Sequence, residues 1–440
     1  MMARVETSKT SGGATESKGA VPSTGGTGTS DERPSYRRVL RHRSFARLWL
    51  AQLVSQSGDF IFEVALLWLV LQATHSVLAV GIVVTGTILP AVLLSPIIGV
   101  YLDRWDRRRT LIFTNLLEGV VVLGLAALVL TGVDSLAPIF GIVFLLGAGM
   151  QVVGISTSAY VHTLLPVEDL TPANSLLSLS GSLNQVVGLA LGGVVVALVG
   201  VTLPIEYDAL SFFVAAVLLA SMPARSRIIS SGAPSHSPPS FRKEFREGFA
   251  FIRAHRFMLE IIAVGMLVNF FGNGLSALFA PYALYVLHGG SAVYGFLGAA
   301  VAVGSLIGAG AIGLANTRRT AGWYLFAGGI CAGLSFTVLG VLNSIPLALV
   351  SLVILGIAIT VTNLPMQTLL QAKVPEGLRG RVIAAFGALV LAAGPVGPVV
   401  IGWIASRWSV SAAFVISGVA ITVIIALGLV TMKALRTIEY

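Results

Sequence analysis

Residues 78–102 read LAVGIVVTGTILPAVLLSPIIGVYL, and the basic stretch DRWDRRR follows at 103–109. The first stretch contains no charged side chain and is longer than the roughly 20 residues that a helix needs to cross about 30 Å of hydrocarbon. It lacks the two-residue alternation of a barrel strand, so in lipid its backbone can satisfy its own hydrogen bonds only as a helix. This stretch therefore predicts a transmembrane helix that ends in a basic loop.

The composition of the whole chain agrees with this prediction. Of its 440 residues, 55% are hydrophobic and 11% are charged. A soluble domain carries about 25% charged residues, so this chain has too few to cover a water-soluble surface. The glycines have no collagen period, and a single cysteine, Cys331, excludes a disulfide scaffold. The composition indicates an all-α membrane protein.

Eleven further apolar runs of similar length give a total of twelve predicted transmembrane helices. The spans are predicted at 46–73, 78–102, 110–131, 137–164, 172–199, 203–222, 257–286, 291–314, 321–341, 346–371, 382–405 and 411–435.

The basic residues indicate the orientation of these spans. Of the 28 Lys and Arg residues, 27 lie in the two tails and the even-numbered loops, and Arg407 alone lies in the other loops. Under the positive-inside rule, both termini are therefore cytoplasmic and the chain is a multi-pass protein of the cell inner (plasma) membrane. Because the positive charges are spread over many inner loops, they indicate contact with anionic lipid headgroups and not with nucleic acid.

The chain also divides into two similar halves. LPVEDL at 165–170 corresponds to VPEGLR at 374–379, 209 residues later. We expect two pseudo-symmetric six-helix lobes with a substrate site between them near the middle of the membrane. The predicted units are a disordered cytoplasmic tail (1–44), an N-terminal lobe (45–222), a cytoplasmic linker (223–256) and a C-terminal lobe (257–435).

The linker contains apolar residues at helical spacing. Phe241, Phe245, Phe249 and Ile252 recur every three to four residues, and basic residues occupy other positions on the helical wheel. This pattern predicts a basic amphipathic helix that lies on the inner membrane surface, and the alternative is a helix that binds a partner.

The loop after the second span carries a sequence motif that resembles a known family signature. Residues 99–109 read GVYLDRWDRRR, which resembles the loop signature of the major facilitator superfamily; Asp106 stands where that family usually has Gly. LTPAN at 170–174, RGRV at 379–382 and Gly58-Asp59 look like the branch that contains enterobactin exporters and macrolide or multidrug efflux pumps. The resemblance covers roughly residues 40–435 and implies a proton antiporter of this branch.

The same loop has a physical interpretation of its own. Asp103 can cap the N-terminus of a neighbouring helix, while Arg104 and Arg107 can reach carboxylates or helix C-termini. The simpler alternative is that the basic residues only hold the loop inside. The resemblance implies a conformational latch that steadies the outward-open state, formed by Gly99, Asp103, Arg104, Arg107 and Arg108.

Glycines and prolines mark two of the spans. The fifth span contains Gly188, Gly192 and Gly193, which resemble the Gly-Pro-x-x-Gly-Gly signature of superfamily antiporters without its proline. The alternative is that these glycines only permit helices to approach closely. In the eleventh span, Pro395 and Pro398 are expected to bend the helix.

Three acidic residues lie deep in the predicted spans and are the predicted proton-coupling residues. Asp59 and Glu63 lie one turn apart in the first span, and Glu118 lies about two turns inside the third. Without a basic partner, burial and mutual repulsion favour the neutral form, and such groups can bind and release protons. The alternative is that they bond to neighbouring side chains and hold helices together. Glu206 and Asp208 are expected in solvent at the outer end of the sixth span. Asp208 also matches an Asp common there in the branch, and this resemblance implies a helix cap.

Two further sets of residues are candidates for the substrate cavity. The membrane-embedded amides either contact substrate or bond between helices; they are Gln151, Asn184, Gln185, Asn269, Asn273, Asn363 and Gln367. Aromatic residues of the seventh span could form a stacking wall; they are Phe270, Phe271, Tyr282 and Tyr285.

The sequence contains no phosphate-binding loop of the Gly-x-x-x-x-Gly-Lys type and no metal-ligand cluster, and we expect no cofactor and no catalytic residue. We therefore predict a monomeric secondary transporter, not an enzyme. It would export a small hydrophobic drug, antibiotic or siderophore in exchange for protons by alternating access. The alternatives are an importer or facilitator of a small metabolite on the same fold, and a transport-inactive membrane sensor or scaffold.

Overall fold

The computed structural model describes residues 36–102, 105–132, 135–223, 241–314 and 321–432. Most of the predicted tail lies outside these residues. The described residues form sixteen α-helices, one short 3-10 helix and no strand. The elements are α1 (Tyr36–Arg41), α2 (Arg43–Thr74), α3 (Val77–Leu102), α4 (Arg107–Leu130), α5 (Leu136–Leu164), α6 (Val167–Val199), α7 (Thr202–Ala220), α8 (Phe241–Ala254), α9 (Arg256–Ser276), α10 (Phe279–Tyr285), α11 (Ser291–Leu314), α12 (Ala321–Val341), α13 (Ile345–Lys373), η2 (Glu376–Leu378), α14 (Arg379–Ala392), α15 (Val396–Arg407) and α16 (Val410–Thr431).

Twelve segments of the described chain are long and apolar enough to cross a membrane, which confirms the predicted spans. Each of α2 to α7 forms one span, as do α11, α12, α13 and α16. The seventh span consists of α9 and α10, and the eleventh of η2, α14 and α15.

The breaks in these two spans have the same cause. Proline lacks the backbone N–H, and its ring clashes with the carbonyl four residues earlier. Pro398 in the first turn of α15 places this clash at Gly394, between α14 and α15, where a bend was expected. Pro281 does the same at Ala277, between α9 and α10. The expected bend of the eleventh span is thus an interruption of the helix, and the seventh span has one as well.

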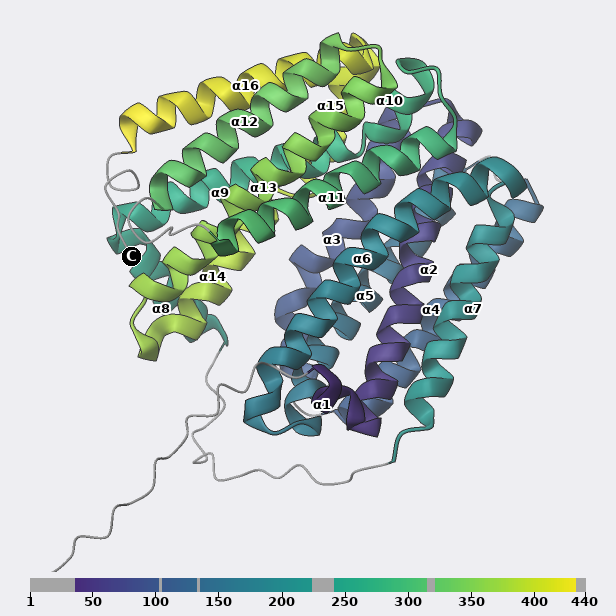
Figure 1. Cartoon of the computed structure of the whole chain (residues 1–440), viewed down its shortest axis with the longest axis vertical. Coiled ribbons are helices and arrows are strands. Elements are labelled where there is room, and N and C mark those ends of the chain that lie inside the picture. Colours follow the sequence, from purple (N-terminus) through teal and green to yellow (C-terminus); the bar gives the residue numbers. More distant parts are fainter. Residues whose placement is uncertain (1–35, 103–104, 133–134, 224–240, 315–320, 433–440) are drawn as a thin grey trace, which may run out of the picture.

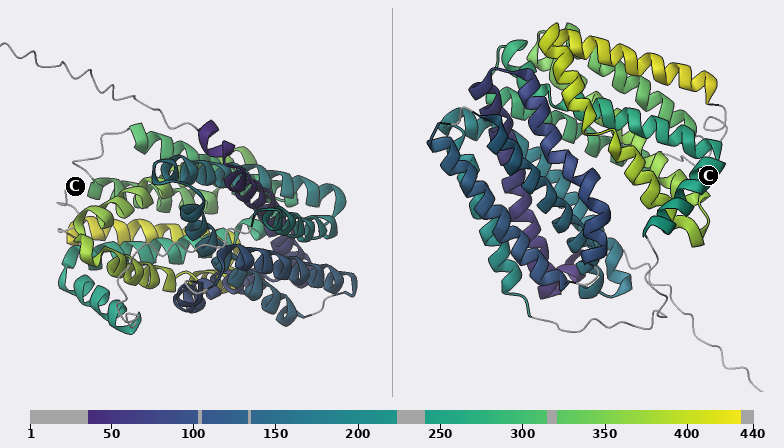
Figure 2. Two further views of the ribbon diagram at one scale, coloured as in Figure 1. Left: turned by 90° about the horizontal axis from the view of Figure 1, so that it is seen from below. Right: turned by 180° about the vertical axis from the view of Figure 1, so that it is seen from behind.

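The spans form two bundles, which we call the N lobe (α2 to α7) and the C lobe (α9 to α16). The helices of each group pack mainly against one another. Figure 1 and the right view of Figure 2 show that the bundles touch at one end and diverge toward the other. The principal contacts between the lobes pair α6 with α11 and α3 with α15.

Glycines allow the lobes to meet backbone to backbone. A Cβ at Gly193 of α6 would stand 2.9 Å from the Cα of Gly295 of α11, which is too close for a side chain. The Ser291 hydroxyl donates a hydrogen bond of 3.1 Å to the Gly193 carbonyl. In the second contact, the Thr85 hydroxyl of α3 donates to the Pro395 carbonyl at 2.8 Å. Both contacts lie toward the end of the molecule at which α3 and α11 begin.

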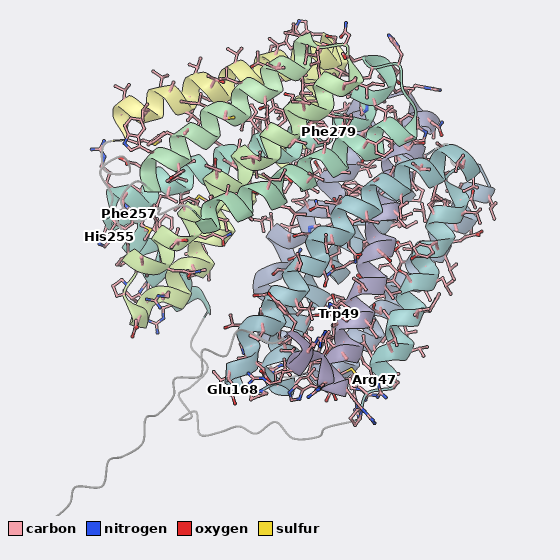
Figure 3. All side chains as sticks on the ribbon, in the orientation of Figure 1. Arg47, Trp49, Glu168, His255, Phe257 and Phe279 are labelled. Atoms are coloured by element: carbon pink, nitrogen blue, oxygen red, sulfur yellow. The ribbon has the colours of Figure 1, made fainter. Side chains whose placement is uncertain are left out.

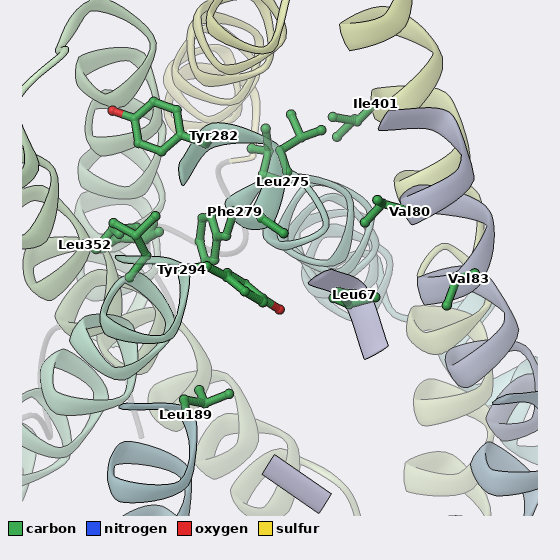
Figure 4. Packing of buried hydrophobic residues seen from close by; sticks show 14 of the residues in the cluster. Leu67, Val80, Val83, Leu189, Leu275, Phe279, Tyr282, Tyr294, Leu352 and Ile401 are labelled. Atoms are coloured by element: carbon green, nitrogen blue, oxygen red, sulfur yellow. The ribbon is translucent and has the colours of Figure 1, made fainter. Parts of the chain in front are cut away.

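A hydrophobic core continues across this contact. Figure 4 shows Leu67 and Val80 of the N lobe near Leu275 and Phe279 of the C lobe, and all four belong to one cluster of buried residues. In lipid, helices associate through close packing and not through the hydrophobic effect. The glycine contacts and this core therefore stabilise the closure of the lobes at one end.

The diverging ends of the lobes carry most of the arginines, and we call this the arginine-rich end. Figure 3 shows Arg47 and Glu168 at this end of the N lobe, and His255 and Phe257 at the corresponding end of the C lobe. Phe279 lies far from both, near the contact between the lobes.

A short helix docks on each lobe at the arginine-rich end. In the N lobe, Arg38 of α1 binds Asp169 of α6, with Nη2 and Oδ1 2.6 Å apart. In the C lobe, α8 packs against α14, where Glu247 pairs with Arg381. Ile252 of α8 is fully buried. The predicted amphipathic helix therefore forms, and its apolar face is divided, because Ile252 packs against protein whereas Phe249 is 40% exposed.

Candidate functional site

Asp59 and Glu63 lie one turn apart on α2, between the interior of the N lobe and the C lobe. Asp59 is partly buried, and Glu63 is exposed. Glu63 is within electrostatic range of Tyr294 on α11 in the C lobe. Asp59 is within such range of Glu118 and Asp208 inside the N lobe. Glu63 thus stands at the boundary between the lobes, and Asp59 stands one turn away on the side of the N-lobe interior.

Glu118 is buried between α4 and α5, and 4% of its surface is exposed. Its carboxyl rests on Gly149 of α5, where an added Cβ would stand 2.8 Å from Glu118 Cδ. Its Oε2 atom has no hydrogen-bond partner among the residues that the structure describes. A buried carboxylate without partners is costly, so this environment favours a proton or a bound cation on Glu118.

Asp208 contradicts the prediction that it is a solvated helix cap. It lies in the second turn of α7 and is completely buried. Its side chain packs on Gly58 of α2, where an added Cβ would stand 2.5 Å from Oδ1. Among the described residues, its polar neighbour is the Ser211 hydroxyl, which donates to the Asp208 backbone carbonyl at 2.8 Å and leaves both carboxylate oxygens without a well-formed hydrogen bond. Glu206, two residues earlier, is exposed as expected.

The helical spacing of α7 explains this burial. Pro204, Ile205, Ser211 and Phe212 are all buried, and Asp208 falls between them at intervals of three to four residues. That face of α7 packs against α2 and α4. The same spacing is visible in the sequence and could have identified Asp208.

Asp59, Glu118 and Asp208 form what we call the acidic cluster. The ion pairs found among the described residues join Asp169, Glu247 and Glu260 to cations, and none of them includes a member of the cluster or Glu63. Three carboxyls within electrostatic range of one another cannot all ionise in a medium of low polarity without compensation. The cluster can therefore hold one or more protons.

The structure places part of the predicted latch. Asp103 and Arg104 lie outside the described residues, and Gly99 lies in the last turn of α3. Arg107 donates to the Ala159 carbonyl of α5 at 3.4 Å. Arg108 donates to two carbonyls of the last residues of α7, Leu219 at 3.0 Å and Ala220 at 2.6 Å. Such contacts stabilise a helix C-terminus, and they remain within the N lobe.

Asp106 caps α4, a role that the sequence suggested for Asp103. The backbone N–H of Arg109 donates to Asp106 Oδ1 at 2.7 Å. Asp106 has a φ of −66°, so its place at the usual glycine position requires no unusual backbone.

The candidate glycines and amides serve different contacts. Gly188 and Gly192 face Phe60 and Ile61 of α2, whereas Gly193 faces α11.

The candidate amides do not share one cavity. Asn184 donates to the Leu53 carbonyl at 2.8 Å. A cavity of about 220 Å³ within the C lobe brings together Asn269, Asn273 and Asn363. Gln151 is partly buried, and Gln185 and Gln367 are exposed.

The four aromatic residues of the seventh span do not form one wall, although the rings of Phe270 and Phe271 meet edge to face with centroids 5.0 Å apart. Tyr282 is fully buried in the C lobe, and its hydroxyl donates to the Leu339 and Leu342 carbonyls. Tyr285 is exposed at the end where the lobes meet. Phe271 lines the cavity that contains the three asparagines.

Twelve spans in two lobes that touch at one end, with acids buried in one lobe, are the features of a two-lobed secondary transporter. The chain belongs to the transmembrane secretion effector family of the major facilitator superfamily, whose family model matches residues 36–439. It is therefore a multi-pass plasma-membrane transporter of small molecules and not an enzyme.

Two relatives match almost the full chain. The multidrug efflux pump Tap of Mycolicibacterium fortuitum is 27% identical over 379 residues, which cover 83% of this chain and 90% of that protein. Macrolide efflux protein A of Streptococcus pyogenes is 24% identical over 385 residues, which cover 86% of this chain and 93% of that protein.

Solved structures share the fold at low sequence identity. A bacterial homologue of the human lysosomal transporter Spinster, in an inward-facing and unoccupied conformation, gives a TM-score of 0.71 at 15% identity and covers 90% of this chain and 96% of its own. The nucleoside transporter NupG gives a TM-score of 0.68 at 13% identity, and the match covers 89% of this chain and 99% of NupG.

Proposed function

We propose that this transporter exports a small hydrophobic organic molecule, such as a drug, antibiotic or siderophore, in exchange for protons. The acidic cluster, which lacks a cation partner among the described residues and continues to Glu63 at the lobe boundary, carries the proposal. The names of the two relatives support efflux and this class of substrate.

The position of the carboxyls suggests how coupling works. Glu63 lies beside the C lobe, so its protonation state sets the local charge that a substrate meets between the lobes. Protons that neutralise Asp59 and Glu63 would lower the affinity for a cationic substrate, and their release would restore it. When the lobes rock, the same residues would be exposed to the other side of the membrane, which couples the two fluxes.

The distribution of the arginines supports the orientation that we propose. We place the arginine-rich end and both termini in the cytoplasm, so the described conformation, with its lobes in contact at the other end, is open toward the inside. In this proposal the transporter acts as a monomer in contact with anionic lipid. The residues at positions 99–108 would act as a latch when the inner ends of the lobes close.

Transport in inverted membrane vesicles tests this proposal. Vesicles that contain the transporter and are acidified inside should accumulate ethidium or erythromycin, and nigericin should abolish the accumulation. The Asp59→Asn and Glu63→Gln variants should lose the proton-driven component, because an amide binds no proton at these positions. If both variants retain full proton-driven uptake, the coupling role of the pair is wrong. Uptake into right-side-out vesicles instead would indicate an importer.

A further inference from the structure

A crevice opens on the N lobe beside the acidic cluster. It has a volume of about 610 Å³ and lies between the C-terminal half of α3, α4 and α5. Asp106 and Arg109 line it at the arginine-rich end, and Glu118 lines it near the middle of the spans. We call it the α4 crevice. Its polar lining consists of Asp106, Arg109, Thr110, Thr114 and Glu118, and its other lining residues are apolar. At about 30 Å³ for each water, its volume can hold a chain of water molecules along the polar side chains.

One face of α4 carries a polar side chain at every turn along this crevice. Asp106, Thr110, Thr114 and Glu118 are spaced four residues apart, and all four line it. Four residues of α-helix rise about 6 Å, a distance that one water molecule with two hydrogen bonds can bridge. The Thr110 hydroxyl itself donates to the Asp106 carbonyl at 3.0 Å.

The two threonines are not solvated surface residues. Thr110 is 8% exposed and Thr114 is 7% exposed, whereas Phe113 between them is 68% exposed. The Thr110 hydroxyl is satisfied by the Asp106 carbonyl, whereas the buried hydroxyl of Thr114 needs a polar partner of its own. The polar row therefore leads inward from Asp106, and it ends at Glu118, whose Oε2 lacks a hydrogen-bond partner within the described chain.

Glu118 also connects this row to the rest of the acidic cluster. It is within electrostatic range of Asp59 and Asp208, and Asp59 is within range of Glu63 at the lobe boundary. The charged groups that line the crevice are Asp106, Arg109 and Glu118. The polar side chains of α4 thus form a row from Glu118 toward the arginine-rich end that does not pass between the lobes.

We propose that the α4 crevice is a water-filled proton path that joins the arginine-rich side of the membrane to Glu118, separate from the substrate path between the lobes. This inference rests on the proposed proton coupling. It assigns Thr110 and Thr114 as positioning residues that hold the water chain and gives the protons a route that a bound substrate does not block.

Cysteine accessibility tests the path directly. In a Cys331→Ser background, the Thr114→Cys variant is exposed to a permanently charged methanethiosulfonate reagent added to inverted vesicles. Leu116→Cys is the matched control, because Leu116 is 42% exposed on the same helix and does not line the crevice. A charged reagent is strongly excluded from hydrocarbon, so the Thr114→Cys variant should react about a hundredfold faster than the Leu116→Cys variant. Thr110→Cys provides a second position if the first variant does not fold.

A blocking variant identifies the route of the reagent. Leu145 lines the crevice from α5 and is 53% exposed, so Leu145→Trp should fill the crevice without disturbing the core. Added to the Thr114→Cys variant, it should slow the modification of the introduced thiol strongly. Equal rates in the Thr114→Cys and Leu116→Cys variants would show that lipid fills the crevice and would overturn the proposal. Fast modification that Leu145→Trp does not slow would overturn it too, because the water would then come from between the lobes.

Transport measurements separate this inference from the proposed function. The Thr110→Val/Thr114→Val pair removes the hydroxyls at nearly constant volume and should slow proton-driven ethidium uptake severalfold with unchanged ethidium binding. The Thr110→Ser/Thr114→Ser pair should restore the rate. If the valine pair transports normally while Asp59→Asn and Glu63→Gln lose coupling, protons are coupled but use another route, and only the crevice proposal fails.

Discussion

The carboxyl of Glu118 on α4 rests against Gly149 on α5, with only 2.8 Å between its Cδ and the place of a Cβ at position 149. Asp208 on α7 packs in the same way on Gly58 of α2. Two glycines on neighbouring helices thus make room for two carboxyls in the N lobe. The acidic cluster depends on these small residues as much as on the acids themselves.

Gly149→Ala should displace the Glu118 carboxyl without removing it. The new methyl group would overlap the present position of the carboxyl, and a displacement of about 1 Å at a functional group can reduce a rate tenfold or more. Proton-driven ethidium uptake in vesicles should fall accordingly. Gly154→Ala is the control, because Gly154 lies on the same helix with nothing within 4 Å of its added Cβ. Equal loss in both variants would contradict a specific effect on Glu118.

Asp208→Asn should uncouple transport, whereas Glu206→Gln should not. Both changes remove one acid from α7, but Asp208 is buried in the acidic cluster and Glu206 is exposed. The asparagine fits the same space and cannot exchange a proton at that position. Vesicle uptake driven by a pH gradient should drop at least about a hundredfold in Asp208→Asn, the lower end of the effect of one proton-transfer group. Unchanged uptake in this variant would make Asp208 a structural residue.

Gly295→Ala should shift the transporter away from the described conformation. Its Cβ would stand 2.8 Å from the Cα of Gly193, so overpacking would penalise the contact between the lobes by about 1–3 kcal/mol. Spin labels at Leu203 and Leu347, two exposed residues in the first turns of α7 and α13 and so on different lobes, should show a larger population at long distance. Gly310→Ala on the same helix meets nothing within 4 Å and should leave the distribution unchanged. Identical distributions in the two variants would mean that the glycine contact does not hold the lobes together.

Arg108→Ala should destabilise the N lobe more than Arg107→Ala. Arg108 makes two hydrogen bonds to the end of α7, and their loss should cost about 1–3 kcal/mol of unfolding free energy. Arg107 makes one long bond of 3.4 Å to Ala159, so its removal should cost less. Thermal unfolding of the purified variants in detergent measures the difference. A larger loss in Arg107→Ala would contradict this assignment.

The spans were predictable because lipid forces each apolar run to satisfy its own backbone. The run at 78–102 became α3, Val77–Leu102, almost without a change of bounds. The break between α9 and α10 was also visible in the sequence, since Pro281 lies within the predicted span. Local rules of this kind require no knowledge of the neighbouring helices.

The composition of the acidic cluster was less predictable. Asp208 lies close to the start of a span, and depth along the helix suggested solvent, whereas the three- to four-residue spacing of Ile205, Ser211 and Phe212 indicated the buried face. The carboxyl pockets at Gly58 and Gly149 depend on which helices pack together, and a single sequence does not contain that information. For the same reason, the sequence identified the candidate amides but did not show which of them share a cavity.

Proton release upon substrate binding tests the central role of these carboxyls most directly. Purified transporter in weakly buffered detergent solution is mixed with ethidium, a pH-indicator dye reports released protons, and calorimetry reports binding. Wild-type protein should release protons as ethidium binds, and the Asp59→Asn/Glu63→Gln variant should release none at saturation. Binding to the wild type without proton release, or equal release from the double variant, would contradict proton coupling through these residues.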